Sequence, residues 1–202
     1  MKVILLAKSN KRMNNKAYGK CVVGLTENGN WIRLVSDASG DSLPDKDCNA
    51  FERLDIIDVE TEKYPLEYQP ENEKLVRFNG KMGKMSIEDV IAKYGVNDDT
   101  HCFINNRNLL YENEMKKTNG SLLLLKAHNL KVYKDDRNIH KAAFEYNGIR
   151  YEDISMTAPE HYNRLFSYDN AFIVVSLPPD TGGYRGYYKF VAAIYPCKSN
   201  SR

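Results

Sequence analysis

The sequence has few of the residues that build metal centres or disulfide frameworks. Its four cysteines, Cys21, Cys48, Cys102 and Cys197, lie far apart and form no CxxC pair, which argues against a disulfide-rich secreted domain and indicates a reducing compartment. The histidines are scattered, and in the one close pair, His101-Cys102, the two side chains would point to opposite faces of a strand. We therefore expect no catalytic metal and no cofactor.

Long apolar runs are missing as well. The first run spans only Val3 to Ala7 and is followed by Lys8, Lys11 and Arg12. A signal peptide needs a longer apolar region behind its basic one, and a membrane span needs about 20 residues. We therefore expect a soluble, cytoplasmic protein with no membrane partner.

Signatures of enzymes are equally scarce. A thiol nucleophile would need a histidine and an orienting group beside it, and the sequence singles out no cysteine in this way. The run Gly80-Lys81-Met82-Gly83-Lys84 lacks the spacing of a phosphate-binding loop. Asp45 and Asp47, or Asp135 and Asp136, are better explained as solvated loop residues than as nuclease ligands. We expect a protein that is not an enzyme.

Charge is abundant and unevenly distributed. The net charge is only +2, yet residues 1–26 hold six cations and no acid, whereas residues 37–73 hold twelve acids against three cations. A basic segment beside an acidic one indicates a one-sided positive surface, which would attract a polyanion. The alternative is a surface loop that lysine merely keeps soluble.

Short β-rich runs separated by turn signals fill most of the chain. Ser86 as N-cap, Asp89 three residues later and Gly95 as a stop predict one helix, and Pro159 favours a second short helix over residues 158–166. Many short strands with one or two short helices favour small barrels over a βαβ sheet. We expect strands at residues 20–26, 31–35, 54–59, 121–126, 130–133, 142–146, 149–151, 172–177 and 187–195.

The two halves of the chain echo each other at one spacing. Val3–Asn10 resembles Leu122–Asn129 at an offset of 119, and the same offset carries Asn28-Gly29 onto Asn147-Gly148. This period is far longer than the roughly 20–50 residues of a solenoid repeat. We interpret it as two related β modules, the alternative being a chance alignment of apolar strands. The first module, the connecting segment and the second module are expected at residues 1–100, 101–119 and 120–202.

Several ordered stretches also carry a family resemblance. They are Gly19–Gly24, Trp31–Ser36, Leu54–Ile57, Ser176-Leu177 and Tyr188–Ile194. In this order they resemble the strands of the prokaryotic dual OB-domain family, over nearly the whole chain. The family has proline where Leu34 stands, and its loop corresponding to Ser9–Gly19 is shorter and less rich in asparagine. The resemblance implies a mainly β fold of two tandem OB-like β-barrels with one or two short helices.

The resemblance also implies a function. It suggests a non-enzymatic nucleic-acid-binding or sensing protein, an accessory component of a prokaryotic defence system. The implied partners are nucleic acid, single-stranded rather than paired, and a protein such as a nuclease or helicase. A protein-interaction adaptor without direct nucleic-acid binding stays open as the alternative, because fold alone does not decide function.

Two stretches have the composition of a single-strand binding surface, in which cations follow the backbone and aromatic rings stack on bases. The candidate residues are Lys8, Lys11, Arg12, Lys16, Tyr18, Lys20 and Arg33 in the first stretch, and Tyr184, Arg185, Tyr187 and Lys189 in the second. The second stretch is equally consistent with a structural role, since strand alternation would bury Tyr187 or Tyr188. Arg33 is either a contact at the barrel mouth or an internal partner of an acid such as Asp55. Trp31 is assigned mainly to the core.

Overall fold

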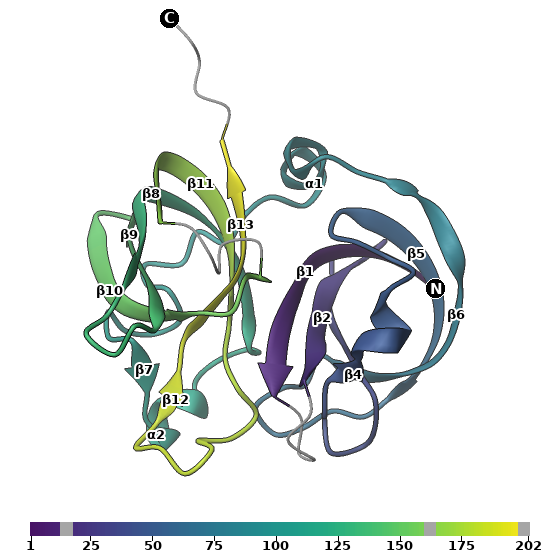
Figure 1. Ribbon diagram of the computed structural model, residues 1–202. Helices are drawn as coiled ribbons and strands as arrows, with labels where there is room; N and C mark the ends of the chain where they lie inside the picture. The colour runs from purple at the N-terminus through teal and green to yellow at the C-terminus, as the bar shows by residue number, and fades with distance from the viewer. Residues whose placement is uncertain (13–17, 160–164, 198–202) are drawn as a thin grey trace, which may run out of the picture. The chain divides into compact units, whose positions relative to one another are not determined.

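A computed structural model describes residues 1–12, 18–159 and 165–197 (Figure 1). The fold is mainly β. Contacts divide the chain into two compact units, Met1–Gly95 and Val96–Arg202. The segment 101–119, which we expected to connect the modules, lies within the second unit. In the described part of the chain, no helix has both the length and the apolar character needed to cross a membrane.

The first unit is a five-stranded barrel with one added strand. Its sheet has the order β1-β5-β6-β3-β2-β4, and an additional β1–β2 pairing closes the ring. The barrel pairs are antiparallel except for β3 with β6, which run parallel. Its elements are β1 (Lys2–Arg12), β2 (Tyr18–Thr26), β3 (Trp31–Val35), β4 (Leu43–Pro44), the 3-10 helix η1 (Asp45–Cys48), β5 (Asp55–Lys63), β6 (Asn72–Lys84) and α1 (Ile87–Tyr94).

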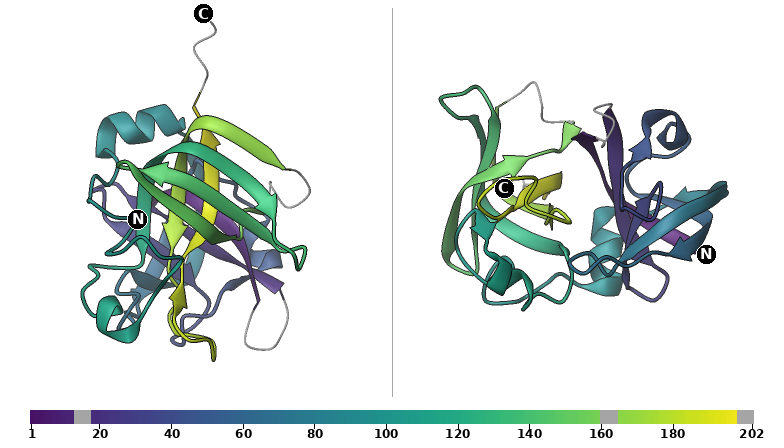
Figure 2. Two further views of the ribbon diagram at one scale, coloured as in Figure 1. Left: turned by 90° about the vertical axis from the view of Figure 1, so that its left-hand side faces the viewer. Right: turned by 90° about the horizontal axis from the view of Figure 1, so that it is seen from below.

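The second unit contains a closed barrel, which the left view of Figure 2 faces, and a small two-stranded sheet. The barrel order is β10-β13-β11-β8-β9, and only the β10–β13 pair is parallel. The small sheet joins β7 to β12. The elements are β7 (Leu109–Leu110), α2 (Glu112–Met115), β8 (Leu122–Lys134), β9 (His140–Tyr146), β10 (Ile149–Met156), β11 (Phe166–Ser176), β12 (Tyr187–Tyr188) and β13 (Phe190–Pro196).

Both barrels share one topology. Counted along the chain, their five strands are ordered first, second, third, fifth, fourth and back to first, with the third and fifth parallel. This is the five-stranded Greek-key barrel of the OB fold. Val3–Asn10 and Leu122–Asn129 lie in the two first strands. Gly29 and Gly148, with φ of 79° and 76°, lie in the turns between the second and third strands.

Local signals placed several elements correctly. Ser86 Oγ accepts a hydrogen bond from Asp89 N at 3.0 Å, and α1 ends at Gly95, whose φ is 78°. The two strands expected at 121–126 and 130–133 are one strand, β8, which continues through a register shift between His128 and Lys131. We did not predict β6, because the sequence of its second half, Phe78–Lys84, holds two glycines and has no regular alternation of apolar and polar residues. The helix expected at 158–166 falls mostly outside the described residues.

The core of the first barrel comes from the inward faces of its strands. At one point β1 and β2 approach so closely that only glycine fits. A Cβ added to Gly24 would lie 2.2 Å from Ile4 O, beside the register shift between Leu5 and Ala7. The core residues are Val3, Leu5, Val22, Ile32, Leu34, Leu43, Cys48, Phe51, Ile57 and Val59.

The second barrel buries a lysine. Lys189 has no exposed surface, and its Nζ donates to Asn105 O at 2.7 Å and to Asn105 Oδ1 at 3.0 Å. The ammonium also lies 5.2 Å from the centroid of the Tyr151 ring. Burial lowers the pKa of Lys189 to about 8, because the charged form loses its hydration.

Replacing Gly24 by alanine should destabilise the first unit. The added methyl group meets a backbone carbonyl that cannot rotate away, so we expect G24A to lower the free energy of unfolding by about 1–3 kcal/mol. The matched control is G83A, whose Cβ would meet its nearest atom at 3.9 Å. Urea unfolding followed by the fluorescence of the single tryptophan, Trp31, measures both. Equal stability of the two variants would contradict the close approach.

The buried lysine predicts a dependence of stability on pH. Between the folded pKa of about 8 and the ordinary value of 10.5, the unfolded chain binds more protons than the folded one, so stability rises with pH. From pH 7.5 to 9.5 the free energy of unfolding of the wild type should gain about 1–2 kcal/mol relative to K189M. Urea unfolding followed by circular dichroism checks this, with K126M at an exposed lysine as control. A constant difference between wild type and K189M would refute it.

Candidate nucleic-acid interface

In the second unit, two segments that are distant in sequence lie against each other. β7 pairs with β12, with Leu110 opposite Tyr187, and the Tyr187 hydroxyl donates to Glu112 Oε2 at 2.6 Å. Gly186 permits this approach, because a Cβ there would lie 2.6 Å from Leu110 O. Lys189 N donates to Asn108 O at 2.9 Å. The loop before α2 is therefore held against the residues around β12.

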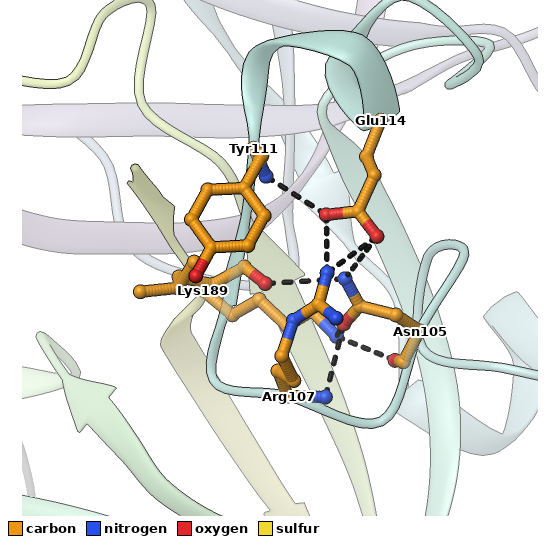
Figure 3. A network of polar contacts seen from close by, with 6 residues as sticks. Asn105, Arg107, Tyr111, Glu114 and Lys189 are labelled. Carbon is orange, nitrogen blue, oxygen red and sulfur yellow. Dashed lines mark hydrogen bonds and ion pairs between the residues drawn. The ribbon is translucent and has the colours of Figure 1, made fainter. Parts of the chain in front are cut away.

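A polar network shapes this loop (Figure 3). Both carboxylate oxygens of Glu114 accept from Arg107 Nη2 at 2.5 Å, and Glu114 Oε2 also accepts from Tyr111 N at 2.8 Å. Asn105 Nδ2 donates to Glu114 Oε1 at 3.2 Å, and Asn105 Oδ1 accepts from Lys189. Burial would raise the pKa of Glu114, but these hydrogen bonds outweigh it and lower the pKa below its ordinary value. The carboxylate thus stays charged and orients Arg107.

Three arginines meet at a hollow of about 500 Å³ beside this network. Arg107 comes from the loop before α2, Arg150 from β10, and Arg185 from the segment between β11 and β12. The guanidinium of Arg107 lies 5.0 Å from the centroid of the Tyr111 ring, which is 44% exposed. We call this surface the arginine hollow.

Acids balance part of this positive charge. Glu152 and Asp153 also line the arginine hollow. Arg150 Nε lies 3.5 Å from Glu152 Oε1, while Asp153 accepts from the Tyr133 hydroxyl at 2.6 Å. Arg185 forms no ion pair within the described ranges. Its charge is therefore the one most open to an incoming anion.

The second candidate stretch divides into an exposed part and a buried part. Tyr184 is 70% exposed, and its ring meets the Tyr188 ring edge-on at 5.9 Å between centroids. Arg185 is exposed beside it. Tyr187 and Lys189 are buried, and their polar atoms bond to Glu112 and Asn105. The exposed Tyr184 and Arg185 are therefore available for binding, whereas Tyr187 and Lys189 have a structural role.

In the first unit, two candidate lysines have partners within the protein. Lys8 is largely buried, and its Nζ donates to Phe51 O at 2.9 Å and to Glu52 Oε1 at 3.2 Å. Lys20 Nζ donates to Asn10 Oδ1 and lies 3.8 Å from Asp45 Oδ1. These bonds hold both ammonium groups close to the barrel wall.

Arg33 is buried, and its partner is an acid we did not name. Its Nη1 donates to Cys21 Sγ at 2.7 Å, and its Nη2 lies 3.4 Å from Glu71 Oε1. Asp55, the acid suggested from the sequence, is instead paired with Lys81 at 2.7 Å. Arg33 is therefore an internal partner of an acid and not a contact at the barrel mouth.

The rest of the basic loop, as we call residues 8–20 with their cations, is only partly described. Lys11 is half-buried on β1. The pKa of Asp37 is lowered mainly by a hydrogen bond from Ser39, and the charge of Lys11 contributes to that lowering. Lys16 lies outside the described residues, as do the side chains of Arg12 and Tyr18. Trp31, assigned mainly to the core, is half-buried at the start of β3.

Among the described residues that line the arginine hollow, the metal-ligating types are two acids, Glu152 and Asp153. The described residues contain no group of three or more histidines, cysteines or acids placed to hold a metal ion. Cys48 and Cys102 are buried, and burial raises the pKa of each thiol to about 12. Neutral thiols of this kind are poor nucleophiles.

Sequence reasoning missed three residues of the arginine hollow, Arg107, Tyr111 and Arg150. Arg107 and Tyr111 lie in the asparagine-rich stretch that we interpreted as a connection. Arg150 carried a signal, because an offset of 117 places Ile149-Arg150 on Ile32-Arg33. The repeat thus indicated that the third strand of each barrel carries an arginine. It did not indicate that Arg33 is buried and Arg150 exposed.

Comparison with known proteins agrees with this architecture. No curated protein and no solved structure matches the chain. A family model described as "Dual OB-containing domain" matches residues 1–194. With two OB-type barrels in tandem and a match over nearly its full length, the chain belongs to the dual OB-containing domain family.

Proposed function

We propose that the chain binds single-stranded nucleic acid and that the arginine hollow of the second barrel is a main contact. The observation that carries the proposal is the convergence of Arg107, Arg150 and Arg185 in one hollow. The exposed ring of Tyr111 belongs to its lining, and the exposed Tyr184 precedes Arg185 in the chain. The planar guanidinium group matches the geometry of phosphate oxygens and binds them in a bidentate way. Three such groups in one hollow suit a sugar–phosphate backbone.

Exposed aromatic rings supply the second kind of contact with a single strand, which is stacking on its bases. Tyr111 and Tyr184 present rings that no core packing requires. Stacking of a base on such a ring contributes about 1–3 kcal/mol and depends little on sequence. The faces of bases are free in a single strand and covered in a duplex. We therefore favour a single strand without strong sequence preference.

The position of two of these arginines on the barrel supports the same proposal. Arg150 lies on β10, the third barrel strand, and Arg185 lies in the connection between the fourth and fifth strands. In OB folds, the face of strands two and three and the loops joining strands one to two and four to five bind oligonucleotides. Glu152 and Asp153 restrict the room for phosphates, so we expect few phosphate contacts and moderate affinity.

We further propose that the protein works without catalysis, as an accessory component of a prokaryotic defence system beside a nuclease or helicase. The buried neutral thiols support a binding role rather than a chemical one. The setting in defence is implied by the resemblance of the strands alone. Co-purification of a nuclease or helicase with the tagged protein from its native host tests it.

Variants at Arg185, in the arginine hollow, and at its neighbour Tyr184 test the proposed binding. Y184A removes an exposed ring and should weaken binding of a fluorescent single-stranded 20-mer by roughly 5- to 150-fold, the equivalent of one lost stack. R185A should weaken it as well and lessen its salt dependence by about one phosphate contact. Fluorescence anisotropy over DNA and RNA, single- and double-stranded, measures these changes.

The matched control is K126A, which removes an exposed cation on β8 away from the arginine hollow. It should bind like the wild type. If Y184A and R185A also bind like the wild type, the arginine hollow is not the contact. If no oligonucleotide binds the wild-type protein, the nucleic-acid proposal fails.

The basic loop of the first barrel is tested separately. Lys11, Arg12 and Lys16 lie in a segment free of acids, and each phosphate contact with a single strand contributes a slope of about −0.7 to log affinity against log salt. The triple variant K11A/R12A/K16A should flatten that slope by about two units and weaken all sequences alike. Its thermal stability should stay close to that of the wild type. An unchanged slope would show that the loop is only a solvated surface.

A further inference from the structure

Most of β6 has a neighbouring strand on one side only. β6 pairs with β5 along almost its whole length, but with β3 only from Asn72 to Lys74, because β3 ends at Val35. From Leu75 to Lys84, the side of β6 away from β5 has no strand beside it within the described ranges (Figure 1). We call residues 75–84 the free edge. An unpaired strand edge offers N–H and C=O groups to another strand.

The free edge also exposes apolar side chains. Val76 is 51% exposed and Met82 60% exposed. A second hollow, of about 440 Å³, lies beside its first residues, lined by Leu75–Phe78 on one wall and by Leu43 and Pro44 on the other. An added strand uses backbone hydrogen bonds for affinity and places alternate side chains in such hollows.

Charge narrows the choice of partner. The free edge carries Arg77, Lys81 and Lys84 and no acid. Arg77 bonds to Glu60 and Lys81 to Asp55, but Lys84 is exposed and makes no ion pair in the described part of the chain. Asp47, on the far wall of the second hollow, disfavours an acid beside Val76. A partner segment should therefore have its acids near Lys84 and apolar residues near Val76.

A second copy of the chain fits this edge poorly. If two free edges paired with each other, their cations would lie on facing strands with no acid between them, and like charges opposite each other destabilise a sheet. A nucleic acid would use the cations but leave the backbone groups and Val76 unused. We propose that the free edge binds an extended acidic segment of a partner protein by strand addition. This site is independent of the arginine hollow and extends the protein's role beyond nucleic-acid binding.

The test compares two labelled ten-residue peptides on the full chain. Valine alternates with glutamate in one peptide and with lysine in the other. Fluorescence anisotropy should show the acidic peptide binding at least about tenfold more tightly. Hydrogen exchange read by mass spectrometry should slow at residues 75–84 when the acidic peptide is bound. An acidic peptide with proline at alternate positions should not bind, because proline removes the N–H groups of the ladder.

Two charge reversals give the matched pair of variants. K84E should weaken binding of the acidic peptide about fivefold or more, since it replaces an attraction by a repulsion near the surface. K93E, on the exposed side of α1, makes the same change of charge elsewhere in the unit and should bind like the wild type. Both lysines are exposed, so neither change should unfold the barrel.

Four results would overturn the proposal. If neither peptide binds, Lys81 and Lys84 serve only to prevent the free edge from pairing with a second copy of the chain. If the acidic peptide binds without slowing exchange at residues 75–84, it binds elsewhere. Slowed exchange that rises with protein concentration alone would indicate a second copy. Slowed exchange at the edge with a single-stranded oligonucleotide, and not with peptide, would make this surface part of a nucleic-acid site.

Discussion

Each barrel depends on one short parallel contact between its third and fifth strands. In the first unit this contact has three residue pairs, from Arg33 opposite Asn72 to Val35 opposite Lys74, and in the second it has two. Every other barrel pair is antiparallel. Without the parallel contact, each unit would be an open sheet with two unprotected edges. Because the β3–β6 contact is so short, most of β6 is unpaired on one side.

A buried cation lies at the closing contact of each barrel. Arg33 is itself the first residue of the β3–β6 contact, and its guanidinium meets Glu71 just before β6. Lys189 directly precedes Phe190, the first residue of the β10–β13 contact, and its ammonium meets the oxygens of Asn105. Removing one member of such a buried polar pair leaves the other without its partner, at a cost of about 3–5 kcal/mol when that partner is charged. Cations in this chain therefore have two roles. Arg33 and Lys189 are buried where the barrels close, whereas others, such as Arg185, present their charge to solvent.

Local sequence predicted what local interactions determine. Ser86 and Gly95 bound α1 because capping needs only residues three or four positions away. The Asn-Gly turns were found for the same reason, and the repeat between Val3–Asn10 and Leu122–Asn129 indicated paired modules. β6 was not found, because the sequence of its second half has no regular alternation of apolar and polar residues, and pairing with β5 makes it a strand. Nor did the sequence indicate the contact between Asn105 and Lys189, which lie 84 residues apart.

The sequence by itself determined that this protein is a tandem of two β modules with a basic beginning and breaker-rich loops, because alternation, turns and charge are properties of neighbouring residues. Only the tertiary structure decided which cations face solvent. Lysine is almost never fully buried unless paired, and the sequence left the stretch with Lys189 open between a binding surface and a structural role. The fold brings it the oxygens of Asn105 and leaves Arg185, four residues earlier, without a partner in the described structure. Burial depends on contacts across the barrel, and no pattern within either segment encodes them.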